Sequence, residues 1–127
     1  MKLVLDTHVF LWLANGDELP KAIALEIGKP MVQLFISSIT AWEIFMLVKK
    51  DFIILDRPAP LWVEESMKQC KVECIDVSPT IAFTATDLEW PHRDPADRFI
   101  IATAKHLDSA LATCDKQIQK SNLLSVV

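Results

Sequence analysis

The sequence predicts an α/β protein in which helices cover both faces of a central, mostly parallel sheet. Short apolar runs alternate along the chain with longer amphipathic segments, which is the pattern of repeated strand–helix–strand units. The chain has 127 residues, of which 51% are hydrophobic, and this length fits one domain with a single sizeable core. We therefore expect residues 1–127 to form one domain.

Five short apolar runs predict the strands. The first, KLVLD, reads as a buried strand that ends on the carboxylate Asp6. We expect the last, LLSVV, to close one edge of the sheet. The five predicted strands cover residues 2–6, 31–37, 72–77, 110–114 and 123–127.

The longer segments carry residues that start or stop helices. Pro20 suits a first helical turn and Gly28 suits a helix end. Ser78–Pro79 and Asp94–Pro95 each place a capping side chain before a proline at the first helical position. The predicted helices cover residues 9–14, 20–27, 40–50, 61–69, 79–88, 95–107 and 115–120.

The composition excludes several kinds of active site. With only two glycines, the chain has no dinucleotide-binding G-x-G-x-x-G, no phosphate-binding loop and no G-x-S-x-G nucleophile turn. The absence of tyrosine removes phenolic nucleophiles. A formal net charge of −4 is unlike most nucleic-acid-binding modules, although a bound metal ion can supply positive charge locally.

The cysteines and the N-terminus predict a cytoplasmic location. Cys70, Cys74 and Cys114 are odd in number and form no C-x-x-C, so we expect no disulfide framework. A zinc site built from them and a histidine would match no common spacing, and we expect small buried hydrophobic side chains instead. The apolar N-terminus imitates a secretion signal, but Asp6 and His8 interrupt it. No apolar run reaches the roughly 18 residues of a membrane span.

Four carboxylates fall where an α/β protein binds ligands. Asp6 and Asp115 follow predicted strands, while Glu43 and Asp97 lie in the first turns of predicted helices. Ligands of open parallel sheets bind outside the carboxyl ends of the strands, near the point where the strand order reverses. We therefore expect these four side chains, from four separate segments, to share one crevice.

Each acid also has a purely structural interpretation. Thr40 and Glu43 have the spacing of a capping box, and Asp94 and Asp97 that of a related one. Four clustered carboxylates cannot all stay ionised without a counter-charge, so some are protonated or a cation is bound. An all-oxygen site suits Mg²⁺ or Mn²⁺, and a metal-activated water can hydrolyse a phosphodiester.

Four stretches resemble, in order and in spacing, the acidic motifs of PIN-domain ribonucleases, and most of all those of VapC toxins of bacterial toxin–antitoxin pairs. They are LVLDTHVFLWL (3–13), SSITAWEI (37–44), HRDPADRFIIATA (92–104) and LATCD (111–115). The resemblance implies a PIN-like three-layer α/β/α fold with a five-stranded sheet. It also implies a Mg²⁺- or Mn²⁺-dependent endoribonuclease that leaves a 5′-phosphate and a 3′-hydroxyl, and an antitoxin encoded alongside that inhibits it.

The resemblance assigns roles by position. The acids that would hold the metal and carry catalysis are Asp6, Glu43, Asp97 and Asp115. The residues that would support these acids or contact RNA are Thr7, His8, Arg93, Asp94, Arg98, Thr113 and Lys116. Two positions depart from the family: His8 stands where many members have Asn or Ser, and Asp51 where a glycine commonly ends the helix.

The sequence also bears on other functions and on partners. A receiver-like signalling module also clusters acids at strand ends, but it needs paired acids after the first strand, and Asp6 has no acidic neighbour. A catalytically inactive PIN scaffold would not need all four acids. The high hydrophobic content predicts exposed interfaces, and with the resemblance it predicts a homodimer that binds an antitoxin. Trp12 and Trp42 could stack bases, or serve as core or interface aromatics.

Overall fold

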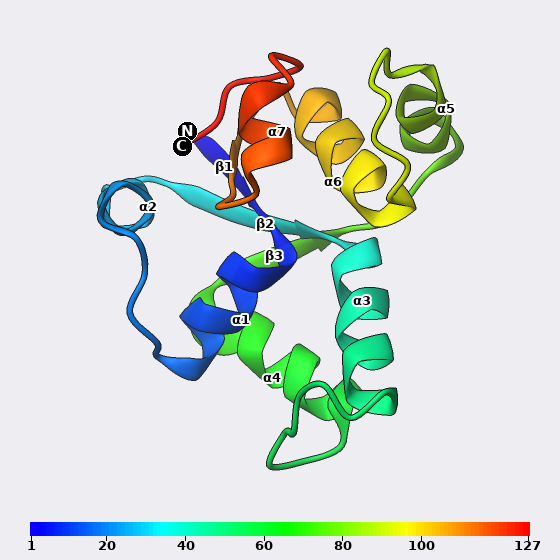
Figure 1. Cartoon of the computed structure of the whole chain (residues 1–127). Coiled ribbons are helices and arrows are strands. Elements are labelled where there is room, and N and C mark those ends of the chain that lie inside the picture. Colours follow the sequence, from blue (N-terminus) through cyan, green and yellow to red (C-terminus); the bar gives the residue numbers. More distant parts are fainter.

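The computed structural model describes residues 1–127 and places a four-stranded parallel sheet at the centre of the molecule (Figure 1). The strand order is β3-β2-β1-β4, so the chain moves outward from β1 through β2 to β3 and then returns to the other side of β1. Leu3 lies opposite Leu34 on one side and Ala110 on the other. The strands are β1 (Lys2–Leu5), β2 (Gln33–Ser37), β3 (Val72–Ile75) and β4 (Ala110–Ala112).

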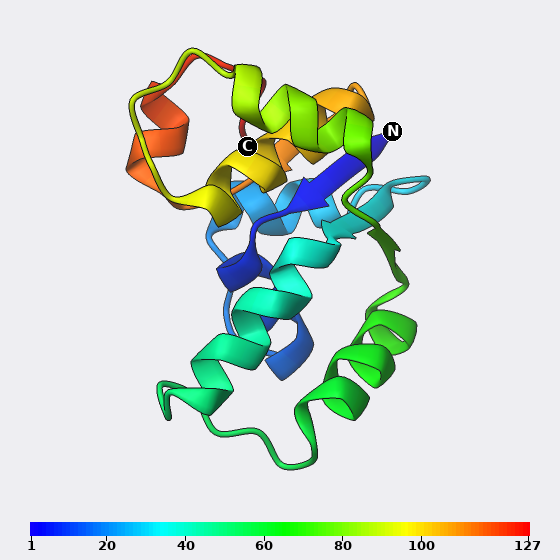
Figure 2. The ribbon, with the colours of Figure 1, turned by 90° about the vertical axis from the view of Figure 1, so that its right-hand side faces the viewer.

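Seven helices surround the sheet. They are α1 (Thr7–Asn15), α2 (Lys21–Ile27), α3 (Ser38–Lys49), α4 (Ala59–Cys70), α5 (Pro79–Asp87), α6 (Pro95–His106) and α7 (Lys116–Lys120). In Figure 1 α1 and α4 lie below the sheet, and α6 and α7 lie above it. Helix α5 packs on the outside of α6 (Figure 2). Helices α3 and α4 extend away from the sheet and are joined at their far ends by residues 50–58.

Successive strand residues point to opposite faces of the sheet, and this alternation creates two separate cores. Leu3 and Leu5 of β1 pack with helices α1 to α4, whereas Val4 between them packs with α6 and α7. All three side chains are fully buried. The predicted α/β/α layering is therefore confirmed.

The predicted fifth strand is wrong in extent. Residues 123–127 form a single parallel bridge, Leu111 to Val126, fixed by hydrogen bonds from Leu111 N to Ser125 O and from Val127 N to Leu111 O, each 3.0 Å. Strand β4 is three residues long, because the chain turns away toward Asp115 directly afterwards. Residues 123–127 therefore have too few backbone groups of β4 beside them to pair as a full strand.

Helix α3 begins earlier than the sequence predicts. Its N-cap is Ser37, whose hydroxyl accepts a hydrogen bond from Ile39 N. Thr40 therefore lies inside the helix and does not cap it, and Glu43 lies in the second turn instead of the first. At the other end, Asp51 adopts the left-handed conformation (φ 60°) that a glycine commonly takes there. None of the helices is both long and apolar enough to span a membrane.

Candidate active site

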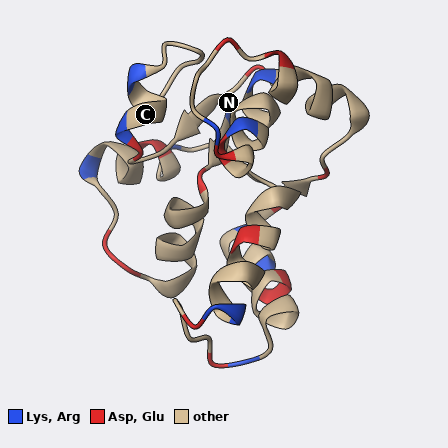
Figure 3. Cartoon of the chain, turned by 45° about the vertical axis from the view of Figure 1, so that its right-hand side comes forward, with Lys and Arg blue, Asp and Glu red and all other residues tan.

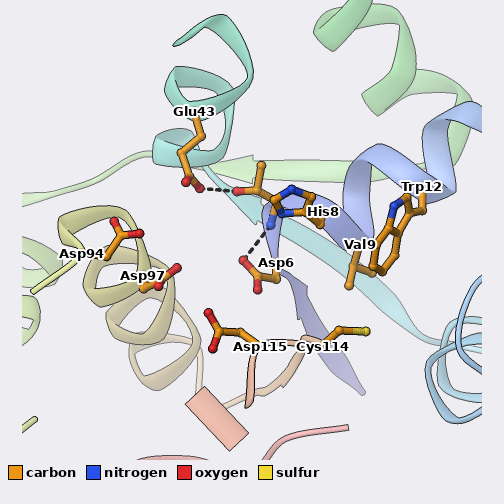
Figure 4. Close-up of a pocket in the computed structure, with 10 residues that line it drawn as sticks. Asp6, His8, Val9, Trp12, Glu43, Asp94, Asp97, Cys114 and Asp115 are labelled. Atoms are coloured by element: carbon orange, nitrogen blue, oxygen red, sulfur yellow. Dashed lines mark hydrogen bonds between the residues drawn. The ribbon is translucent and has the colours of Figure 1, made fainter. Parts of the chain in front are cut away.

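The four predicted acids, Asp6, Glu43, Asp97 and Asp115, line one pocket of about 310 Å³. Figure 3 shows acidic positions from separate segments meeting near the middle of the molecule. In Figure 4 the carboxylates of Asp6, Asp97 and Asp115 point into a common space, with Glu43 above them on α3. The pocket lies at the carboxyl ends of β1 and β4, where the strand order reverses.

Asp6 is fixed by hydrogen bonds to both of its carboxylate oxygens. One oxygen caps helix α1 by accepting from Thr7 N at 2.8 Å. The other accepts from the hydroxyl of Thr113 at 2.5 Å. Thr113 Oγ1 in turn accepts from Asp115 N at 3.0 Å. The buried Thr113 therefore joins the acid after β1 to the acid after β4.

Glu43 is oriented by two threonine hydroxyls in series. Thr7 Oγ1 donates to Glu43 Oε1 at 2.5 Å and lies 3.1 Å from Thr40 Oγ1. Because Thr7 has a single hydroxyl hydrogen, Thr40 is the donor in the second bond. Thr40 is fully buried. The sequence predicts Thr40 as a helix cap, and its place one helical turn before Glu43 is the only indication in the sequence of this role.

Asp97 lies in the first turn of α6 and is contacted by a histidine that sequence reasoning did not place in the site. His92 Nε2 is 2.9 Å from Asp97 Oδ2. One potential ligand atom from each of His92, Asp94 and Asp97 lies within 4.8 Å of the other two. Asp94 caps α6 through Ala96 N, as its position before Pro95 predicts. The indication for His92 was its place in the same HRDPAD stretch as the two acids.

The acids of the pocket have histidines beside them but no lysine or arginine. Burial raises the pKa of Asp6 and Glu43 above their ordinary values, although hydrogen bonds from Thr113 and Thr7 act in the opposite direction. Burial and the nearby Asp94 carboxylate raise the pKa of Asp97 to about 7. No lysine or arginine lines the pocket. A cation would therefore supply the charge that the chain itself does not.

Arg98, predicted as an RNA contact, has a different role. All of its N–H donors point to backbone carbonyls at the end of α5 and in the loop that follows. The acceptors are the oxygens of Ala85, Thr86, Leu88, Trp90 and His92. Arg98 has no donor left for a phosphate. Arg93 and Lys116 are exposed and lie outside the pocket lining.

The cysteines are less buried than the sequence predicts. Cys70 and Cys74 are half-buried and Cys114 is exposed, all as free thiols. Cys114 lines the pocket because it lies between Thr113 and Asp115 at the end of β4. The group of possible metal ligands whose atoms lie within 4.8 Å of one another, His92, Asp94 and Asp97, contains no cysteine.

The PIN domain family model matches residues 3–122. This chain belongs to the PIN domain family. It is 28% identical over 119 residues to Ribonuclease VapC22 of Mycobacterium tuberculosis, a match that covers 92% of this chain and 89% of that protein.

Solved structures of toxin–antitoxin proteins share this PIN fold. The chain superposes on one from the DNA-bound VapBC2 structure of Rickettsia felis with a TM-score of 0.76 and 19% identity, covering 100% of this chain and 98% of that one. For VapBC-1 of nontypeable Haemophilus influenzae the TM-score is 0.68 at 20% identity, covering 100% and 97%. For a Klebsiella pneumoniae toxin–antitoxin complex it is 0.65 at 24%, covering 98% and 95%.

The pocket of this PIN domain is suited to a hard cation and unsuited to receiver-type signalling. Its donor groups are carboxylate oxygens held by hydroxyls and backbone amides, which is the ligand chemistry of Mg²⁺ and Mn²⁺. A receiver-like site would need a lysine beside its acids, and none lines the pocket.

Proposed function

We propose that this PIN domain is a Mg²⁺- or Mn²⁺-dependent endoribonuclease. The observation that carries the proposal is the convergence of Asp6, Glu43, Asp97 and Asp115 in one pocket that no lysine or arginine lines. The similarity to a VapC ribonuclease supports the choice of RNA as substrate. The presence of all four acids argues against a catalytically inactive scaffold.

Asp6, Asp97 and Asp115, with Glu43, would hold the metal. The bound ion would supply an activated water and polarise the phosphoryl oxygen. Thr113 keeps the Asp6 carboxylate turned into the pocket, and Thr7 does the same for Glu43. The imidazole of His92, at hydrogen-bond distance from Asp97, fixes the direction of that carboxylate. These contacts hold the oxygens in place before any ligand arrives.

We also propose two protein partners, an antitoxin and a second copy of this chain. Large apolar side chains are exposed on α3 and the segment after it, among them Trp42, Phe52 and Ile54. Exposed apolar groups that gather on one part of a surface are typical of interfaces. The solved structures with this fold include complexes of VapC with VapB proteins. A free-thiol chain of this kind fits the reducing cytoplasm.

The test is cleavage of mixed cellular RNA by purified protein that carries no antitoxin. We expect fragments with Mn²⁺ and none with chelator. Asp97→Asn should lower the cleavage rate by at least ~100-fold, since one ligand and its charge are lost. The control is Asp87→Asn, which changes an acid at the end of α5 outside the pocket. Fragments that persist with chelator, or in Asp97→Asn at the wild-type rate, would contradict the proposal.

A further inference from the structure

Two aromatic rings form one wall of the acidic pocket. His8 and Trp12 are four residues apart on α1 and therefore lie on the same face of the helix. Their ring centroids are 6.2 Å apart, with the planes tilted by 54°. Both line the pocket, and Figure 4 shows them across it from Asp94 and Asp97.

Trp12 packs against the core while part of its side chain remains accessible. The side chain packs against the core on the α1 side of the sheet and is only partly buried. It also lines an adjoining groove of about 390 Å³ together with Leu19, Pro20 and Lys21. A continuous surface therefore runs from the carboxylates, past the two rings, to the start of α2. The indole N–H of Trp12 makes no hydrogen bond within the chain.

The charge of the pocket decides what these rings can bind. If RNA is cleaved here, as proposed above, the scissile phosphate lies at the carboxylates. The residues of the pocket include five acids and no lysine or arginine, so the chain offers the strand no ion pairs at this point. Stacking on aromatic side chains is the uncharged alternative and contributes about 1–3 kcal/mol per base.

We propose that Trp12, with His8 beside it, is a subsite that stacks one unpaired nucleobase next to the scissile phosphate. The subsite selects single-stranded RNA, because a base inside a duplex does not expose its face. It favours a purine at that position, because a purine covers more of the indole than a pyrimidine does.

The first experiment removes bases one at a time from a short RNA whose cleavage position is known. An abasic ribonucleotide keeps the phosphate and sugar but cannot stack. For the wild type, we expect one abasic position beside the cleaved bond to lower kcat/KM by about tenfold. Trp12→Ala should lower the rate on intact RNA by a similar factor and show no further loss at that position. Trp12→Phe should retain most of the wild-type behaviour. Leu25→Ala, which changes an exposed apolar side chain on α2 outside the pocket, is the control.

Two results would overturn the subsite. In the first, the Trp12→Ala variant cleaves intact RNA at the wild-type rate, even if it no longer binds a partner protein. In the second, the abasic position lowers the cleavage rate of the Trp12→Ala variant tenfold, as it does for the wild type. Trp12 would then act only through the fold. Thermal unfolding of each variant shows that it is folded.

A second readout separates this proposal from the proposed nuclease activity. A purine nucleoside, which has a base to stack and no phosphate for the acids of the pocket to repel, is titrated in chelator while tryptophan fluorescence is followed. We expect quenching in the wild type and in Trp62→Phe, which changes a buried core tryptophan outside the pocket, and much less in Trp12→Phe. This difference would support the subsite even if the wild type cleaved nothing. Equal quenching in all three proteins would overturn the subsite, whatever the cleavage assay shows.

Discussion

Among the acids of the pocket, Asp97 is the one whose pKa burial and neighbouring charges raise most strongly. The residue is 8% exposed, and its carboxylate lies near the charges of Asp94, Asp6 and Asp115. The folded chain therefore holds a proton on it up to a pH of about 7, while the unfolded chain releases that proton near the ordinary value of 3.8. The stabilisation that this protonated group provides is complete below pH 3.8 and is lost as the pH rises through 7.

We predict that Asp97→Asn stabilises the metal-free protein at neutral pH. Asparagine is uncharged at every pH, so the variant should unfold with a free energy about 1–3 kcal/mol higher than the wild type at pH 7.5. The gain should shrink as the pH falls toward 4. Thermal unfolding in chelator at several pH values measures this, and parallel pH curves for the two proteins would contradict it. Added Mn²⁺ should raise the wild-type Tm and leave that of the variant nearly unchanged.

Thr113 offers a second test at the scale of one side chain. Thr113→Val keeps the shape but removes the hydroxyl that donates to Asp6 and accepts from Asp115 N. We expect Mn²⁺ affinity to fall by about tenfold, because the carboxylate is no longer held in one direction. Titration followed by electron paramagnetic resonance measures it. Thr103→Val is the control, since that buried hydroxyl bonds only to Phe99 O in its own helix. An equal loss in both variants would indicate a general effect on the fold.

Among the elements, the loop between α5 and α6 depends most on one side chain. Residues 88–94 have no regular secondary structure, yet Arg98 binds the carbonyls of Leu88, Trp90 and His92. The bond to His92 O also helps to place that imidazole against Asp97. Arg98 does not line the pocket, but it holds the loop in the conformation that places His92 against Asp97.

Arg98→Ala should destabilise the protein by about 2–4 kcal/mol, since several charge-assisted hydrogen bonds are lost together. Arg98→Lys should recover little, because an ammonium cannot reproduce the planar fork. Hydrogen exchange should increase at residues 88–94 in both variants. Arg93→Ala is the matched control, because that neighbouring arginine is exposed and makes no hydrogen bond or ion pair. Unchanged stability of Arg98→Ala would show that the loop is held by other contacts.

The sequence predicts helix starts well where only one residue can cap. Helices α5 and α6 begin where Ser78–Pro79 and Asp94–Pro95 predict. Helix α3 was placed two residues late because Ser37 and Thr40 are both good caps, and only the structure shows which hydroxyl meets a free amide. The contact of His92 with Asp97 and the contacts of Arg98 could not be predicted for another reason. They depend on how an irregular loop folds back on a helix, which leaves no periodic pattern in the sequence.

For the molecule as a whole, the parallel sheet made the convergence of the acids predictable. The strand ends of one parallel sheet meet at one edge, so Asp6 and Asp115 were expected together, and both line the pocket. The length of the last strand was not predictable, because it depends on where β4 stops pairing and not on the apolar character of residues 123–127. That the four acids hold a metal remains a prediction.

The exposed apolar side chains predict self-association. Phe83 on α5 and Phe52 after α3 are exposed to 69% and 71%. We expect the purified protein, at micromolar concentration and without antitoxin, to sediment with about twice the mass of a 14.3 kDa chain. A monomer under these conditions would contradict the homodimer.

The hydrogen bond between Thr113 and Asp6 joins residues 107 positions apart. The pairing of β1 with β4 spans a similar distance along the chain. On the ribosome, the first acid is therefore made long before the hydroxyl that orients it and before Asp115, which completes the pocket. If the chain cleaves RNA, a growing polypeptide stays harmless to the messenger that encodes it until residue 115 has left the exit tunnel.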